Sequence, residues 1–194
     1  IIPFVETMAI QSCNLSCVGC TNYSDLIHKG YVSWNSIEND LKEWLEVIDI
    51  EDFGIMGGEP LLNPEIEQWI IGIRKLLPNS RIRFTTNGLK LHKNFHLVDL
   101  MHKLGNFSFK ITAHKNTTEL QKSIEKILKS YDWKPVAEFG IDRLITTNDF
   151  RFHVKSPSTF YKTFKGSYHD MKPHNSNPIE AFDMCIQQTC PLLH

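Results

Sequence analysis

The residues with the clearest chemical potential are three cysteines near the start of the chain. Cys13, Cys17 and Cys20 have the spacing Cys-x3-Cys-x2-Cys within the stretch CNLSCVGC. Thiolates suit zinc or iron–sulfur clusters, but a structural zinc site and a closed [4Fe–4S] cluster each take about four protein ligands. Three thiols therefore predict either a cluster with one iron open to a small molecule, or a zinc site whose fourth ligand lies elsewhere, such as Cys185 or a histidine.

Small or polar residues follow three later segments of strand-like sequence, in the stretches GGEP, TTNG and ITAH. They are, in chain order, Gly57, Gly58, Glu59, Pro60, Thr86, Asn87, Thr112 and His114. Taken singly, a double glycine or an Asn-Gly pair indicates a turn, and an isolated histidine is most often structural. Ligands of α/β folds bind outside the carboxyl ends of the strands, so we expect these groups and the cysteines to meet at one mouth.

The elements that must position these groups alternate along the chain. Segments of strand character are followed by apolar residues at helical spacing, four times in succession and without a change in composition. We expect strands at residues 4–11, 52–56, 81–85 and 107–112, and helices that begin at Asn35, at Asn63, before Leu97 and at Thr117 or Thr118. A closed (β/α)8 barrel takes about 250 residues. The predicted fold is therefore an α/β partial, TIM-like barrel of parallel strands with four to six βα units.

The remaining chain divides into an extension of the barrel and a tail. Residues 142–155, DRLITTNDFRFHVK, predict either a fifth strand or a hairpin that turns at Asn148 and Asp149. We assign residues 1–155 to the barrel. Residues 156–194 are rich in Pro, Ser, Asn and His and predict a loop-rich extension.

The cysteine loop after a first strand, together with Gly57-Gly58-Glu59-Pro60 after a second, resembles the radical S-adenosylmethionine (radical SAM) superfamily. The resemblance covers roughly residues 4–130. It implies that the three cysteines hold a [4Fe–4S] cluster and that the open iron binds the amino and carboxylate groups of S-adenosylmethionine. It also implies reductive cleavage of this cofactor to a 5′-deoxyadenosyl radical, which takes a hydrogen atom from a substrate.

The resemblance also implies roles for the polar groups at the strand ends. The GGEP stretch contacts the methionine amino group, through a hydrogen bond to Glu59 in our reading. Thr86 and Asn87 face the methionine carboxylate or the ribose, and Thr112 and His114 contact the ribose or the substrate, with His114 the candidate catalytic residue.

One residue departs from the superfamily pattern. Many members carry an aromatic residue beside the adenine just before the third cysteine, where this chain has Gly19. We expect the adenine contact to come from backbone there or from another residue such as Tyr23.

Two further cysteines lie in the tail, in the stretch CIQQTCPLLH. Cys185 and Cys190 are either ordinary thiols or possible auxiliary ligands, because Cys190-Pro191 resembles the start of the auxiliary-cluster extension of SPASM or twitch relatives. Two thiolates cannot complete a second cluster, so we expect one cluster in this chain. On this reading the chain is a SPASM or twitch member truncated at its C-terminus.

Composition and net charge limit the classes of partner that we expect. A net charge of −1 gives no electrostatic reason to expect nucleic acid or an anionic membrane. An odd count of five cysteines does not fit a secreted disulfide framework, so we expect a cytoplasmic protein. The open barrel suits a bulky substrate such as a peptide or a nucleotide sugar, and the chemistry needs an electron donor such as flavodoxin or ferredoxin. A zinc-stabilised binding module and an iron–sulfur electron carrier remain the alternatives.

Overall fold

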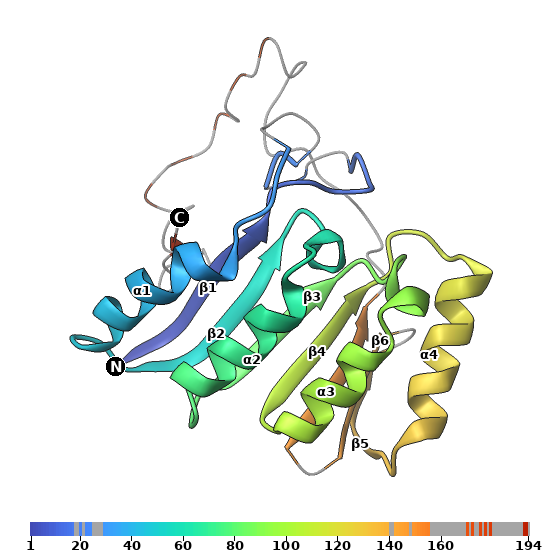
Figure 1. Ribbon diagram of the computed structural model, residues 1–194. Helices are drawn as coiled ribbons and strands as arrows, with labels where there is room; N and C mark the ends of the chain where they lie inside the picture. Colours follow the sequence, from blue (N-terminus) through green and yellow to red (C-terminus); the bar gives the residue numbers. More distant parts are fainter. Residues whose placement is uncertain are drawn as a thin grey trace.

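One open sheet with helices organises the computed structural model (Figure 1). The strands are β1 (Ile2–Ile10), β2 (Ile50–Gly57), β3 (Arg81–Thr86), β4 (Phe107–Thr112), β5 (Lys134–Phe139), β6 (Asp142–Thr147), β7 (Phe150–Lys155) and β8 (Leu192–Leu193). The structure describes residues 1–17, 20, 22–24, 29–139, 142–147, 149–155, 170, 172, 175, 177, 179 and 192–193.

The sheet is mostly parallel and does not close. Its strand order is β5-β6-β7-β4-β3-β2-β1-β8, and only the pairs β5–β6 and β6–β7 are antiparallel among the described strands. The terminal strands β5 and β8 each pair on one side. This arrangement confirms the predicted α/β partial barrel.

The helices follow from the order of the first four strands. They are α1 (Trp34–Leu45), α2 (Ile66–Leu76), α3 (His96–Leu104) and α4 (Thr118–Ser130), with short 3-10 turns η1 (Pro60–Leu62) and η2 (Leu91–Lys93). Strands β1 to β4 advance in one direction across the sheet, and right-handed crossovers then place every connecting helix on one face. Figure 1 shows α1, α2 and α3 over the same face of the sheet.

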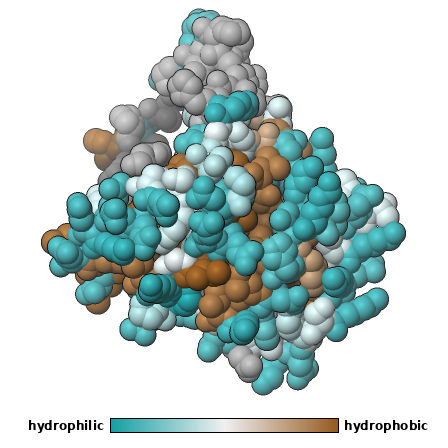
Figure 2. Space-filling model, viewed as in Figure 1, coloured by the Kyte–Doolittle hydropathy of each residue, from teal (hydrophilic) through white to brown (hydrophobic). Residues whose placement is uncertain are grey.

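The core lies between that face and the helices. Aligned positions of neighbouring strands supply fully buried apolar side chains, among them Val5, Phe53, Ile82 and Phe107. On the helix side, Trp69, Ile70 and Ile73 of α2 are also fully buried. Hydrophilic residues dominate the outward side of the helix layer, and hydrophobic ones show between the helices (Figure 2).

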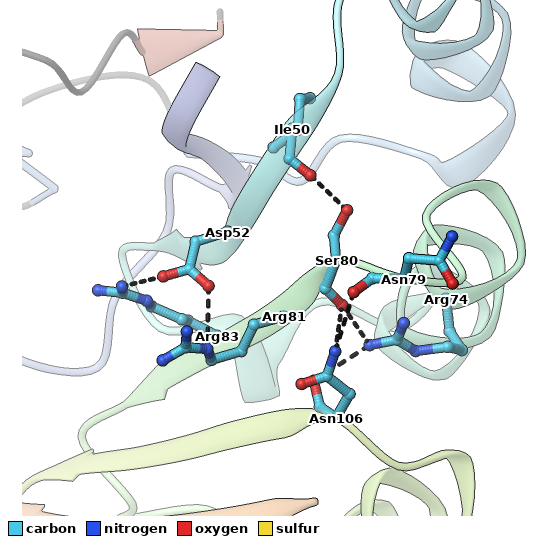
Figure 3. Close-up of polar contacts among 8 residues, drawn as sticks. All are labelled: Ile50, Asp52, Arg74, Asn79, Ser80, Arg81, Arg83 and Asn106. Carbon is cyan, nitrogen blue, oxygen red and sulfur yellow. Dashed lines mark hydrogen bonds and ion pairs between the residues drawn. The ribbon is translucent and has the colours of Figure 1, made fainter. Parts of the chain in front are cut away.

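A polar network pins the amino-terminal ends of β2 and β3 (Figure 3). The Arg74 guanidinium of α2 donates to the carbonyl oxygens of Ser80, at 3.0 Å, and Asn106, at 3.1 Å. On the sheet face opposite the helices, the nearly buried carboxylate of Asp52 pairs with Arg81 (3.0 Å) and Arg83. These contacts fix the strand ends that lie furthest from the polar stretches singled out above.

Several predicted element boundaries are confirmed and others shift. Helix α4 is capped by Thr117, whose hydroxyl accepts from the Leu120 N–H at 3.2 Å. The Asn35 cap was wrong, because Ser33 caps α1 and accepts from the Ser36 N–H. The second helix starts later than predicted, at Ile66, after the unpredicted turn η1.

Residues 142–155 adopt both predicted forms at once. Strands β6 and β7 form an antiparallel hairpin in which Thr147 pairs with Phe150, while β7 also runs parallel to β4 as a further strand of the main sheet. Strand β5 was not predicted. In the tail, Leu192 and Leu193 pair with β1, where the sequence predicted loop.

The contact between α1 and α2 generates a prediction at Gly72. Replacing glycine by alanine inside a helix usually stabilises it by about 1 kcal/mol. Here a Cβ atom on Gly72 would lie 2.1 Å from Cζ2 of the Trp34 ring, so overpacking should dominate. We expect Gly72→Ala to lower the free energy of unfolding by about 1–3 kcal/mol in denaturant titrations.

A double-mutant cycle provides the control. In a Trp34→Ala background, the same Gly72→Ala change meets no ring and should be neutral or stabilising. A penalty of the same size in both backgrounds would contradict the packing argument.

Candidate functional site

A cavity of about 290 Å³ lies at the carboxyl ends of β1 to β4. It brings together all four stretches that the sequence singled out. The predicted site residues that line it are Cys13, Cys17, Cys20, Gly57, Gly58, Thr86, Asn87, Thr112 and His114. A larger hollow of about 620 Å³ lies at the opposite ends of the strands and is lined by no cysteine or histidine.

The three thiols open into this cavity without forming disulfides. Each cysteine is partly exposed, and a turn that joins the Cys20 N–H to the Cys17 carbonyl (3.2 Å) shapes the loop. Burial raises the pKa of the Cys13 thiol, and a metal ion that binds a thiol deprotonates it. In the part of the chain that the structure describes, no three His, Cys, Asp or Glu side chains are already gathered as a metal site. A set of three soft donors around one cavity fits an iron–sulfur cluster with an open position.

Backbone contacts hold the cysteine loop against the end of β2. The Gly58 N–H donates to the Ile10 carbonyl at 2.8 Å, and the Glu59 N–H donates to the Ser12 carbonyl at 3.0 Å. From the far side of the loop, the Asn22 amide donates to the Gly57 carbonyl at 2.8 Å. The loop therefore enters the site already tied to the GGEP stretch.

The two glycines are required by this close approach. Gly57 has φ of +144°, a conformation that favours glycine, and a Cβ there would lie 2.2 Å from the Ile10 carbonyl oxygen. A Cβ on Gly58 would lie 2.2 Å from the Ser12 carbonyl oxygen. A side chain at Gly58 would therefore strike the cysteine loop itself.

The side chain of Glu59 bonds to groups of the protein, and its expected contact with the methionine amino group stays a prediction. This side chain is fully buried and does not line the cavity. Oε1 accepts from the Thr86 hydroxyl (2.5 Å) and the Leu61 N–H (3.0 Å), and Oε2 accepts from the Asn87 N–H (2.7 Å). Burial raises the pKa of this carboxyl, and the three donors oppose that rise. The carboxylate thus joins the ends of β2 and β3.

The end of β3 reaches the cysteine loop through Asn87. Its amide nitrogen donates to Oδ1 of Asn14 at 2.8 Å and lies 4.0 Å from Sγ of Cys13. The Thr86 hydroxyl, besides donating to Glu59, accepts from the Gly88 N–H at 2.9 Å. Both residues are nearly buried, so their orientations are fixed by these contacts.

Thr112 and His114 complete the cavity at the end of β4. The His114 N–H donates to the Thr112 carbonyl at 2.9 Å, which forms a tight turn after the strand. Burial lowers the pKa of His114, which favours the neutral imidazole.

Besides Glu59, five of the expected residues lie outside the cavity or outside the described residues. Pro60 is buried at the start of η1 and does not line the cavity, and neither does Tyr23. Gly19, Cys185 and Cys190 lie outside the described residues, so the adenine contact and the auxiliary ligands stay predictions.

The sequence interpretation missed several cavity residues. Leu15, Asn22, Met56 and Thr85 also line it. Met56 and Thr85 sit one residue before predicted site residues, and strand alternation places each on the face opposite the core. That alternation was the signal that could have identified them.

Comparison with known proteins decides the family. The model of the Radical SAM superfamily matches residues 9–148, more than half of the chain. The chain belongs to the radical SAM superfamily. Among curated proteins, none matches it.

Two solved structures were compared with this chain. The crystal structure of BtrN in complex with AdoMet and 2-DOIA is similar at a TM-score of 0.55 and 20% identity, covering 67% of this chain and 53% of BtrN. An open conformation of BtrN gives a TM-score of 0.48 at 22% identity, covering 60% of this chain and 52% of that one. The chain therefore spans about half the length of the BtrN structures that it matches. At this identity the likeness shows the fold alone.

The buried carboxylate of this radical SAM chain generates a stability prediction. Glu59→Ala leaves three buried donors without an acceptor, and each unsatisfied donor lowers the stability of the fold by about 1–3 kcal/mol. We expect the free energy of unfolding of the metal-free protein to fall by about 3 kcal/mol or more, measured by denaturant titration.

Glu67→Ala on α2 is the matched control, because this glutamate is exposed and its ion pair among the described residues is with His96 at 3.4 Å. Its effect should stay within about 0.5 kcal/mol. Equal losses in the two variants would show that Glu59 does not hold the strand ends together.

Proposed function

We propose that this chain holds a [4Fe–4S] cluster at Cys13, Cys17 and Cys20 and acts as a radical SAM enzyme. The cluster would supply the electron that cleaves S-adenosylmethionine to a 5′-deoxyadenosyl radical, which abstracts hydrogen from a substrate. The observation that carries the proposal is the single cavity onto which three thiols and the carboxyl ends of β2, β3 and β4 open.

The chain's own groups would bind and orient S-adenosylmethionine in this cavity. The backbone of Gly57 and Gly58 lines one wall, held at fixed distance from the cysteine loop. The hydroxyls of Thr85 and Thr112 and the neutral imidazole of His114 line the wall formed by β3 and β4. Such neutral donors and acceptors suit the hydroxyls of a ribose or a polar substrate.

The two alternatives explain less of the site. An electron carrier would need a fourth thiolate, and a zinc module would need a fourth ligand. Neither alternative uses a cavity bordered by the ends of three further strands.

Substrate and partners belong to the proposal as well. BtrN was crystallised with AdoMet and 2-DOIA; we propose the first of these, S-adenosylmethionine, for this chain. For the substrate, we propose a peptide or protein, or a nucleotide sugar, since the sheet is open at both edges. The electron would come from a flavodoxin or ferredoxin. Every helix that the structure describes is too short or too polar to serve as a membrane span.

Metal analysis tests the cluster. Protein purified without oxygen should contain about four irons and about four sulfides per chain and give an EPR signal after reduction. Replacing Cys13, Cys17 or Cys20 by Ala should abolish the cluster. Stoichiometric zinc without sulfide would refute the proposal, and about eight irons would mean that Cys185 and Cys190 serve a second cluster.

Product analysis tests the chemistry. With dithionite and S-adenosylmethionine, the parent protein should release 5′-deoxyadenosine and methionine in equal amounts, measured by chromatography with mass spectrometry. The Cys17→Ala variant is the matched control and should release neither. A parent protein that carries the cluster but forms no 5′-deoxyadenosine would contradict the proposed reaction.

A further inference from the structure

Asn87 occupies a defined place between β3 and the cysteine loop. Asn87 is 6% exposed, and its backbone N–H donates a hydrogen bond to the buried Glu59 carboxylate at 2.7 Å. This hydrogen bond involves only the backbone, so the side chain is free to serve a different partner.

The contacts of the Asn87 side chain fix which end of its amide faces the loop. Oδ1 accepts from the Leu89 N–H at 3.0 Å. A backbone N–H can only donate, so the atom facing it must be the oxygen. The NH2 group therefore points to the cysteine loop, 2.8 Å from Oδ1 of Asn14 and 4.0 Å from Sγ of Cys13.

The two amide hydrogens have two acceptors. One serves the Asn14 oxygen, and the other is directed to the Cys13 sulfur. Asn14 Oδ1 also lies 4.0 Å from that sulfur, but it can interact only with a protonated thiol. Once Cys13 binds iron as a thiolate, the sulfur has no hydrogen to give, and the side chain of Asn87 can donate to it beside the backbone N–H groups of Asn14 and Leu15.

We propose that the N–H···S contact from Asn87 to Cys13 raises the reduction potential of the cluster. This inference rests on the proposed function, because it concerns the cluster that these cysteines would hold. A one-electron reduction, with the electron from an external donor, makes the cluster more negative. Hydrogen bonds to ligating sulfur stabilise that negative charge and raise the potential. Asn87 thereby makes it easier for the electron to enter.

The test is a redox titration of the reconstituted full chain in the absence of S-adenosylmethionine, followed by EPR. Asn87→Leu removes the donor without adding charge. It should lower the reduction equilibrium constant by about tenfold, which is about 59 mV for one electron. Asn87→Asp keeps the acceptor for Leu89 and should shift the potential in the same direction.

Asn14→Ala is the matched control, since it removes the other partner of the same amide and leaves Cys13 its donor. Its potential should equal the parent value or lie above it. The inference is overturned if Asn87→Leu leaves the potential unchanged, or if Asn14→Ala lowers it as much. It is overturned too if both Asn87 variants lose their iron while Asn14→Ala keeps it, because Asn87 would then only hold the loop.

A parent protein without iron and sulfide would instead refute the proposed function itself. The two failures are therefore distinguishable by the iron and sulfide content of the parent. Binding of S-adenosylmethionine, measured by calorimetry on the same samples, separates a further role: weaker binding at an unchanged potential would place Asn87 on the cofactor and overturn the inference.

Discussion

The buried carboxylate of Glu59 is the group on which the geometry of the site depends. Three hydrogen bonds from η1 and the end of β3 converge on it, and its own backbone N–H is bound to the cysteine loop. A carboxylate removed from water is costly unless such donors compensate it, so these segments are stable only when all are in place. The contact with Asn87 then extends the same connection to Cys13.

A second constraint is the close approach of backbones at the ends of β1 and β2. The carbonyl oxygens of Ile10 and Ser12 occupy the space that Cβ atoms would take at Gly57 and Gly58. The cavity can therefore be lined by main chain at this point, which places dipoles at short range without flexible side chains. The two glycines leave room for the cysteine loop to lie directly against the end of β2.

The polar contacts that hold the strands together lie at one end of the sheet, and the cavity lies at the other. At the amino-terminal ends of β2 and β3, Arg74 and Asp52 take part in dense polar contacts. At the carboxyl ends, the cavity leaves the three thiols partly exposed. Successive right-handed crossovers place α1, α2 and α3 on one face of the sheet (Figure 1), and Met56 and Thr85 line the cavity from the opposite face.

The sequence by itself determined the fold class, the first four strands and the residues that meet at their ends, because alternating periodicity and the carboxyl-end rule are local and general. It also identified the cysteine loop, whose spacing carries its own chemistry. Only the tertiary structure decided the direction of the Glu59 carboxylate, the purpose of Gly57 and Gly58, and the contact of Asn87 with Cys13. Each depends on atoms from segments roughly 30 to 75 residues apart, and no local pattern encodes which way a side chain turns when two strand ends are brought together.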